Sequence, residues 1–90
     1  MKADELKHCL DREVELWCRK DYRTLLKELK DVVAYEGSDV SSKYQVEVQL
    51  LESTTEYVHV MVAVDDGTLF RSFKPLSWSF IVHSDGREER

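Results

Sequence analysis

The chain contains few of the residues that mark nucleotide-binding or membrane-spanning proteins. Only three glycines and one proline occur among its 90 residues. No glycine-rich loop able to cradle phosphates is present, and neither Ser77 nor Ser79 stands in a G-x-S-x-G nucleophile motif. No apolar run approaches the roughly 18 residues that a membrane span requires. The sequence therefore argues against a nucleotide-binding enzyme and against a membrane protein.

The chain also has fewer basic than acidic residues, and this charge balance limits which kinds of partner it can bind. Thirteen basic residues against eighteen acidic residues give a formal charge of −5. This sign opposes nonspecific binding to nucleic acid or anionic lipid, because such binding needs a positive field that releases counterions. We therefore expect no nucleic-acid partner and no membrane contact. Because residues 1–5 are followed by no apolar stretch, they do not resemble a signal peptide, and we expect a cytoplasmic protein.

The two cysteines predict free thiols. Cys9 and Cys18 are nine positions apart, so on one helix they lie about 13.5 Å apart along the axis and on opposite sides. A disulfide needs Cα atoms closer than about 7 Å, so the two cannot pair with each other there. Cys9 shares the apolar stripe of the helix and should be buried, whereas Cys18 lies off that stripe and should be partly exposed.

No close pair of metal-ligating residues is present. His59 and His83 have the parity to face one another across a strand pair, but no H-x-H or C-x-x-C spacing accompanies them. Asp65, Asp66 and Gly67 have the composition of a turn and lack the alternate oxygen ligands and distal Glu of a calcium loop. We expect neither a metal nor a cofactor.

The N-terminal third predicts helix over residues 3 to about 34. Its apolar residues recur at spacings of three and four, which is the stripe of an amphipathic helix. The stripe consists first of Leu6, Cys9, Leu10, Val14 and Trp17, and then, after a change of phase near Lys20, of Leu25, Leu26, Leu29, Val32 and Val33. Asp21 is well placed to cap a second helix. Two helices and one bent helix are both compatible with this pattern.

The rest of the chain predicts three strands, at about residues 44–52, 57–64 and 76–83, in which apolar and polar residues alternate. The rows expected to be buried are Val46, Val48 and Leu50, then Val58, Val60 and Val62, then Trp78, Phe80 and Val82. They should pack against Leu10, Val14, Trp17, Leu25, Leu26 and Leu29. Residues 53–56 and 84–86 read as turns, residues 37–42 as a linker and residues 87–90 as a frayed end.

Residues 68–75 are too apolar for a plain loop, so they form either a short edge strand or an ordered flap. Pro75 cannot donate to a sheet ladder, so the last strand should begin after it. Residues 1–90 are therefore expected to form one α+β domain. In this domain a bent helix, or two helices, would pack on an antiparallel sheet of three to four strands.

Both ends of the chain resemble those of a known superfamily. The junction Lys20-Asp21-Tyr22 and the segment LLKELKDVV at 25–33 are similar to the opening of nuclear-transport-factor-like domains. The segment SFIVHSDGR at 79–87 is similar to their last strand, which often closes with an Asp-Gly turn. The resemblance implies a cystatin-like fold, in which a curved antiparallel sheet wraps around helices. Members include isomerases, dehydratases and non-catalytic dimer or adaptor domains, and the resemblance transfers no catalytic residue to this chain.

The sheet face opposite the valine rows is the candidate contact surface. It carries Tyr57, His59, Met61, Ile81 and His83, which share one parity on two strands expected to be close. This mixed surface suits a protein interface or a pocket wall. We expect a small non-catalytic binding or assembly domain that joins a second copy of itself, or another protein, through this face.

The alternative is a small pocket protein or minor enzyme that takes a small ligand. Tyr57, His59, His83 and Asp85 would then lie near a cavity between sheet and helix. A histidine is the natural acid or base near neutral pH.

Overall fold

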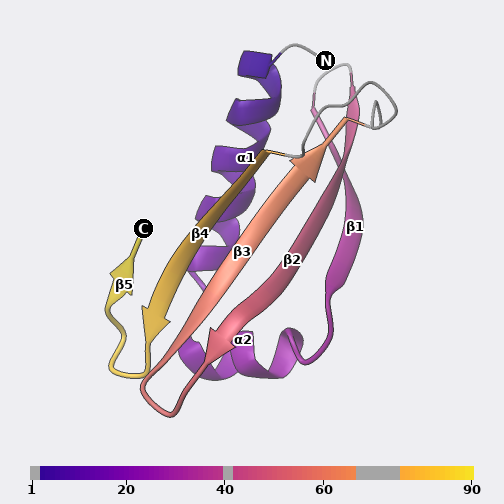
Figure 1. The fold of residues 1–90 in the computed structure, drawn as a ribbon. Coiled ribbons are helices and arrows are strands. Elements are labelled where there is room, and N and C mark those ends of the chain that lie inside the picture. The colour runs from indigo at the N-terminus through magenta and orange to yellow at the C-terminus, as the bar shows by residue number, and fades with distance from the viewer. Residues whose placement is uncertain (1–2, 40–41, 67–75) are drawn as a thin grey trace.

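The computed structural model of the chain describes residues 3–39, 42–66 and 76–90, and these form an α+β fold (Figure 1). Two helices, α1 (Ala3–Cys18) and α2 (Tyr22–Glu28), precede the strands. The strands are β1 (Val33–Ser38), β2 (Lys43–Ser53), β3 (Tyr57–Asp65), β4 (Leu76–His83) and β5 (Glu88–Glu89). In the described part of the chain they make one antiparallel sheet in the order β1-β2-β3-β4-β5.

The predicted α+β class and antiparallel sheet are confirmed, but the described sheet has five strands where three to four were expected. Helix α1 lies along one face of the sheet behind β3 and β4, and α2 lies across the end of that face (Figure 1). No helix within the described ranges is long and apolar enough to cross a membrane. Gly67 and residues 68–75, predicted as a turn followed by a strand or flap, lie outside the described residues.

The break between α1 and α2 follows from the capping chemistry of Asp21. This residue has the extended backbone of an N-cap, and its side chain accepts a hydrogen bond of 2.8 Å from the backbone N–H of Thr24. Hydrogen bonding to the side chain of Thr24, and then to its backbone N–H, lowers the pKa of the Asp21 carboxyl. Across the bend, Lys20 forms an ion pair of 2.7 Å with Glu28. Of the two arrangements compatible with the sequence, the chain therefore adopts two separate helices.

The prediction of helix to residue 34 is wrong, because the segment after α2 is a strand. Helix α2 ends at Glu28, and β1 pairs with β2 so that Val33 lies opposite Val48 and Tyr35 opposite Val46. Pairing with β2 half-buries both β1 side chains against the core, and this gain outweighs the local helical spacing. Gly37 and Ser38, predicted as part of a linker, also belong to β1.

The predicted parity of the sheet is confirmed in β2, in β3 and in the second half of β4. The even-numbered side chains of these strands, up to Leu50 in β2, face the helices and make a buried core. On the sheet side the core consists of Tyr44, Val46, Val48, Val58, Val60, Val62, Val64, Phe80 and Val82. On the helix side it consists of Cys9, Leu10, Val14, Trp17, Cys18, Leu25 and Leu29. Leu26 and Leu50, also expected in the core, are half-buried against it.

Three predictions about the last third of the chain and its contacts are wrong. Trp78 was expected in the core but is 53% exposed, because no described strand flanks β4 at that level. Residues 87–90 were expected to fray, yet β5 pairs with β4 opposite Ile81 and Val82. Cys18 was expected to be partly exposed but is 3% exposed, because it packs in the hydrophobic core. Arg90 also donates from Nη2 to its thiol Sγ at 2.9 Å. Both cysteines are free thiols.

A buried carboxylate connects α1 to β1 and β2. Glu13 is 5% exposed and accepts hydrogen bonds from the hydroxyl groups of Tyr35 and of Tyr44, the latter at 2.8 Å. Trp17 Nε1 donates to the Tyr35 hydroxyl at 2.9 Å, and Arg12 Nη2 donates to the Tyr44 hydroxyl at 2.9 Å. Burial, with a further contribution from the Glu13 hydrogen bond, raises the pKa of Tyr35. Each polar group of this cluster has a partner, so the cluster fixes the helix on the sheet.

Candidate functional site: the open face of the sheet

The face of the sheet that points away from α1 and α2 is here named the open face. It carries the odd-numbered side chains of β3 and β4, and these include Tyr57, His59, Met61, Ile81 and His83. The register sets Tyr57 opposite His83 and His59 opposite Ile81. All five are half-buried by their neighbours, although no described helix or strand covers this face (Figure 1). The residues predicted as a contact surface are therefore brought together on adjacent strands.

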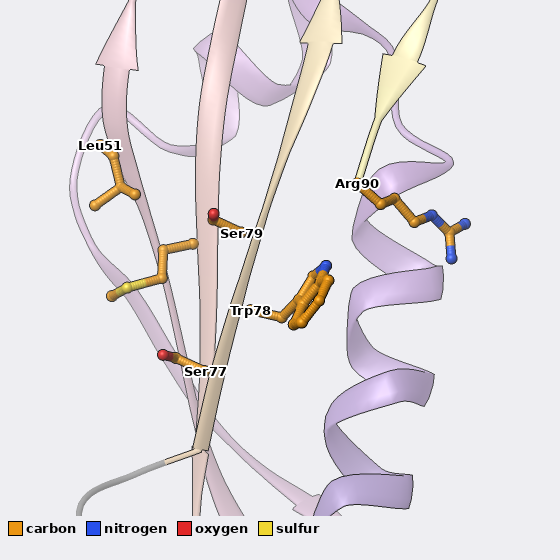
Figure 2. Close-up of a pocket in the computed structure, with 6 residues that line it drawn as sticks. Leu51, Ser77, Trp78, Ser79 and Arg90 are labelled. Carbon is orange, nitrogen blue, oxygen red and sulfur yellow. The ribbon is translucent and has the colours of Figure 1, made fainter.

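The centre of the open face is apolar and includes Leu51, which sequence reasoning missed. Leu51 is 48% exposed and lines a surface hollow of about 400 Å³ together with Met61 and Ser79. Figure 2 shows Leu51 and Ser79 on the same side of the sheet. Leu51 follows Gln45, Glu47 and Gln49 in the alternation of β2, and the register shift between Leu50 and Glu52, a β-bulge, brings Glu52 to the same face opposite His59. The alternation of β2 would have assigned Leu51 to this face, whereas the position of Glu52 depends on a bulge that a strict period of two cannot locate.

One end of the open face is organised by two carboxylates. The hydroxyl group of Tyr57 donates to Glu52, and His83 Nε2 lies 2.6 Å from Glu89 Oε2. The Tyr57 and His83 rings are tilted, with centroids 6.1 Å apart. The hydrogen bond to the Glu52 carboxylate raises the pKa of Tyr57. These four side chains form a row across β2, β3, β4 and β5 that holds the two rings in place.

Among the described residues, carboxylates outnumber basic groups around the open face, where Arg90 lines the hollow but is paired with Glu15. Strand alternation and pairing place Glu47, Glu52, Asp65 and Glu89 on this face, and Lys43 with them. Lys43 lies 3.5 Å from Glu36 on β1, so its charge is offset. The open face therefore has an apolar centre and an acidic rim.

The alternative prediction of a pocket protein requires a hollow lined by the histidines or Asp85, and three hollows lined by described residues bear on it. Three surface hollows of about 400, 380 and 400 Å³ lie on the open face, between α2 and β2, and between α1 and β4. None of these three is lined by His59, His83 or Asp85. Asp85 lies in the β4–β5 turn, where the backbone N–H and the Nε of Arg87 donate to it and lower its pKa. Within the described residues, no group of three or more His, Cys, Asp or Glu side chains could hold a metal ion.

No protein-family model, no curated protein and no solved structure matches the chain. The resemblance to nuclear-transport-factor-like domains therefore stays a prediction. Function is inferred below from the open face itself.

Proposed function

We propose that this chain is a small non-catalytic binding or assembly domain that joins a second copy of itself through the open face. The observation that carries the proposal is the apolar centre of that face. Leu51, Met61 and Ile81 lie there on adjacent strands, and no described element covers them. Removing such surface from water is favourable by about 25 cal/mol per Å² of apolar area. A two-fold pair lets each copy cover the same patch on the other.

The chemistry around the centre also supports an interface. Methionine and tyrosine are enriched in the middle of protein interfaces, while charged groups gather at the rim. Met61 lies in the middle of the open face, and Tyr57 borders it with its ring held by Glu52. A side chain that is already fixed loses little conformational entropy on binding.

The acidic rim determines how self-association should respond to salt. Two copies that meet face to face bring like charges such as Glu47 and Glu89 toward one another. Salt screens such repulsion, with a Debye length of about 10 Å at 0.1 M. Association of two copies should therefore strengthen as ionic strength rises. A basic partner of another kind would show the opposite dependence.

The test is sedimentation velocity over micromolar to millimolar protein, at low and at high salt. We expect a dimer whose dissociation constant falls with added salt. Met61→Lys puts a charge in the apolar centre and should raise the dissociation constant at least about tenfold, equivalent to about 1.4 kcal/mol. The matched control is Leu16→Lys, because Leu16 is an apolar residue on α1 with 51% exposure. This control should dimerise like the unmodified chain.

Two results would contradict the proposal. One is a chain that stays monomeric at millimolar concentration. The other is a Met61→Lys variant that assembles as well as Leu16→Lys does.

A further inference from the structure

Two of the chain's three histidines lie at one end of the open face. His59 is on β3 and His83 is on β4, at the end of the sheet where β2 turns into β3 and β4 turns into β5 (Figure 1). The backbone N–H of Ser84 donates to the carbonyl of Glu56 at 2.7 Å, so the two turns lie side by side. All residues of both turns are described, and the β3–β4 register sets the two histidines on the same face.

A carboxylate stands beside each of these histidines. Glu52 lies opposite His59 in the β2–β3 register. His83 Nε2 lies 2.6 Å from Glu89 Oε2. The hydroxyl group of Tyr57, whose ring lies next to that of His83, donates to Glu52. The two imidazoles therefore belong to one cluster with two carboxylates and one phenol.

The other charged groups described near this end leave it acidic. The two turns contribute Glu56, Asp85 and Arg87. Arg87 Nε lies 2.9 Å from Asp85 Oδ2, so the charge of Arg87 is offset within its own turn. Arg90, which follows β5, pairs with Glu15 of α1 at 2.9 Å. The helices pack on the other face of the sheet (Figure 1). Carboxylates thus dominate the described surroundings of both histidines.

Mild acidification changes the charge of this end of the open face. An imidazole ordinarily gains its proton between about pH 8 and about pH 5, whereas a carboxyl group ordinarily titrates at about pH 4. With neutral histidines the chain carries a formal charge of −5, so two copies repel each other. Protonation of His59 and His83 reduces this repulsion at the surface where the two copies meet.

Covering a charged imidazole also has a cost, because a cation that leaves water loses hydration. For His83 this cost is small, since its side chain is only 19% exposed in a single copy. Glu89 stays beside it, and the acidic rim of the second copy adds further negative charge. His59 is likewise half-buried in a single copy, with Glu52 opposite. The electrostatic gain therefore exceeds the loss of hydration at both positions.

We propose that protons regulate self-association through the open face, which strengthens under mild acid as His59 and His83 become cations within the acidic rim. This inference rests on the proposed function and adds its regulation. Because such coupling is reciprocal, formation of the dimer takes up protons. Acid and salt then act on the same repulsion, which acid neutralises and salt screens.

The test is sedimentation velocity between about pH 8 and about pH 5.5. In about 0.05 M salt the dissociation constant of the dimer should fall at least about fivefold over this range, the lower end of typical coupling factors. In about 1 M salt the Debye length is only about 3 Å, so most of this difference should vanish. Circular dichroism at both pH values checks that the fold is retained.

Variants separate the two histidines of the open face from the charge of the whole chain. With His59→Gln and His83→Gln combined, the ratio of the dissociation constants at the two pH values should approach one. The matched control is His8→Gln, because His8 is exposed on α1 and outside the open face. This control should keep the full pH dependence. Glu52→Gln and Glu89→Gln combined keep two hydrogen-bond acceptors but remove two charges, so this chain should gain less from acidification.

The possible failures can be told apart. A chain that stays monomeric at every pH and salt concentration would refute the proposed function, and this inference with it. A dimer with the same dissociation constant at both pH values would refute only the regulation by protons. A dimer that weakens on acidification would show that the lost hydration of the imidazoles prevails. Loss of the pH dependence in His8→Gln would assign it to net charge and overturn the role of the open face.

Discussion

Tyr44 on β2 lies so close to Gly37 on β1 that a side chain at position 37 has no room. A β-carbon built on Gly37 would stand 2.5 Å from Cε2 and from Cζ of the Tyr44 ring. The two residues are opposite one another in the β1–β2 register, and Tyr44 is 2% exposed. The hydroxyl group of Tyr44 is also held by Arg12 and Glu13, so the ring is not free to withdraw.

Gly37→Ala should therefore destabilise the fold. The added methyl group must displace a buried ring, and overpacking of this kind costs about 1–3 kcal/mol. Urea unfolding followed by circular dichroism measures the change. Ser38→Ala on the same strand is the control, because Ser38 is exposed and contributes its backbone carbonyl to Arg12. Equal stability of the two variants would contradict the steric argument.

Glu13→Ala should lower the free energy of unfolding by at least about 2 kcal/mol, since it removes the acceptor of two tyrosine hydroxyls. Glu13→Gln should cost less, because its amide oxygen still accepts. The effect of Glu13→Ala should shrink in a Tyr35→Phe, Tyr44→Phe background, which no longer has the hydroxyls to leave unpaired. The double-mutant cycle compares urea unfolding of the unmodified chain, of Glu13→Ala, of the chain with both tyrosine changes and of the chain that combines all three changes. Strictly additive effects would show that the hydrogen bonds do not determine the loss.

Stability should decline at alkaline pH. Burial is the largest cause that raises the pKa of the Tyr35 and Tyr44 hydroxyls and of the Cys9 and Cys18 thiols. The unfolded chain releases these protons near the ordinary values of 9.0 for cysteine and 10.0 for tyrosine, while the folded chain retains them. The associated stability is thus complete below about pH 9 and is lost as the pH rises, by up to about 1.4 kcal/mol per pH unit per group.

Urea unfolding at stepped pH from neutral to about pH 11 tests this dependence. Tyr35→Phe removes one of the titrating groups and should make the decline above pH 10.0, the ordinary tyrosine value, shallower. An unchanged slope in this variant would exclude Tyr35 as a contributor.

Phe80 and Trp78 share a strand and a parity but should differ strongly in their contribution to stability. Phe80 is 1% exposed, so Phe80→Ala leaves a cavity and should cost about 3–5 kcal/mol. Trp78 is 53% exposed, so Trp78→Ala should cost less than about 1 kcal/mol. Thermal and urea unfolding give both values. Comparable losses at the two positions would mean that Trp78 belongs to the core after all.

Features that depend on residues close in the sequence were predictable. The alternation in β2 and β3 assigned the buried valines correctly, because side chains alternate between the two faces of any strand. Asp21 caps α2 as its position predicts, and β4 begins at Leu76, immediately after Pro75. The five predicted contact residues lie together on the open face for the same reason.

Features that depend on what lies beside a segment were decided only by the tertiary structure. Val33 and Tyr35 have helical spacing, but pairing with β2 makes them a strand. Glu52 lies opposite His59 on the open face because of a bulge that exists only in the pairing of β2 with β3. Trp78 follows the buried parity yet is exposed where no described strand flanks it, and Arg90 donates to the buried thiol of Cys18 from far along the chain. Parity determines which face a side chain occupies, but only a neighbouring element determines whether that face is covered.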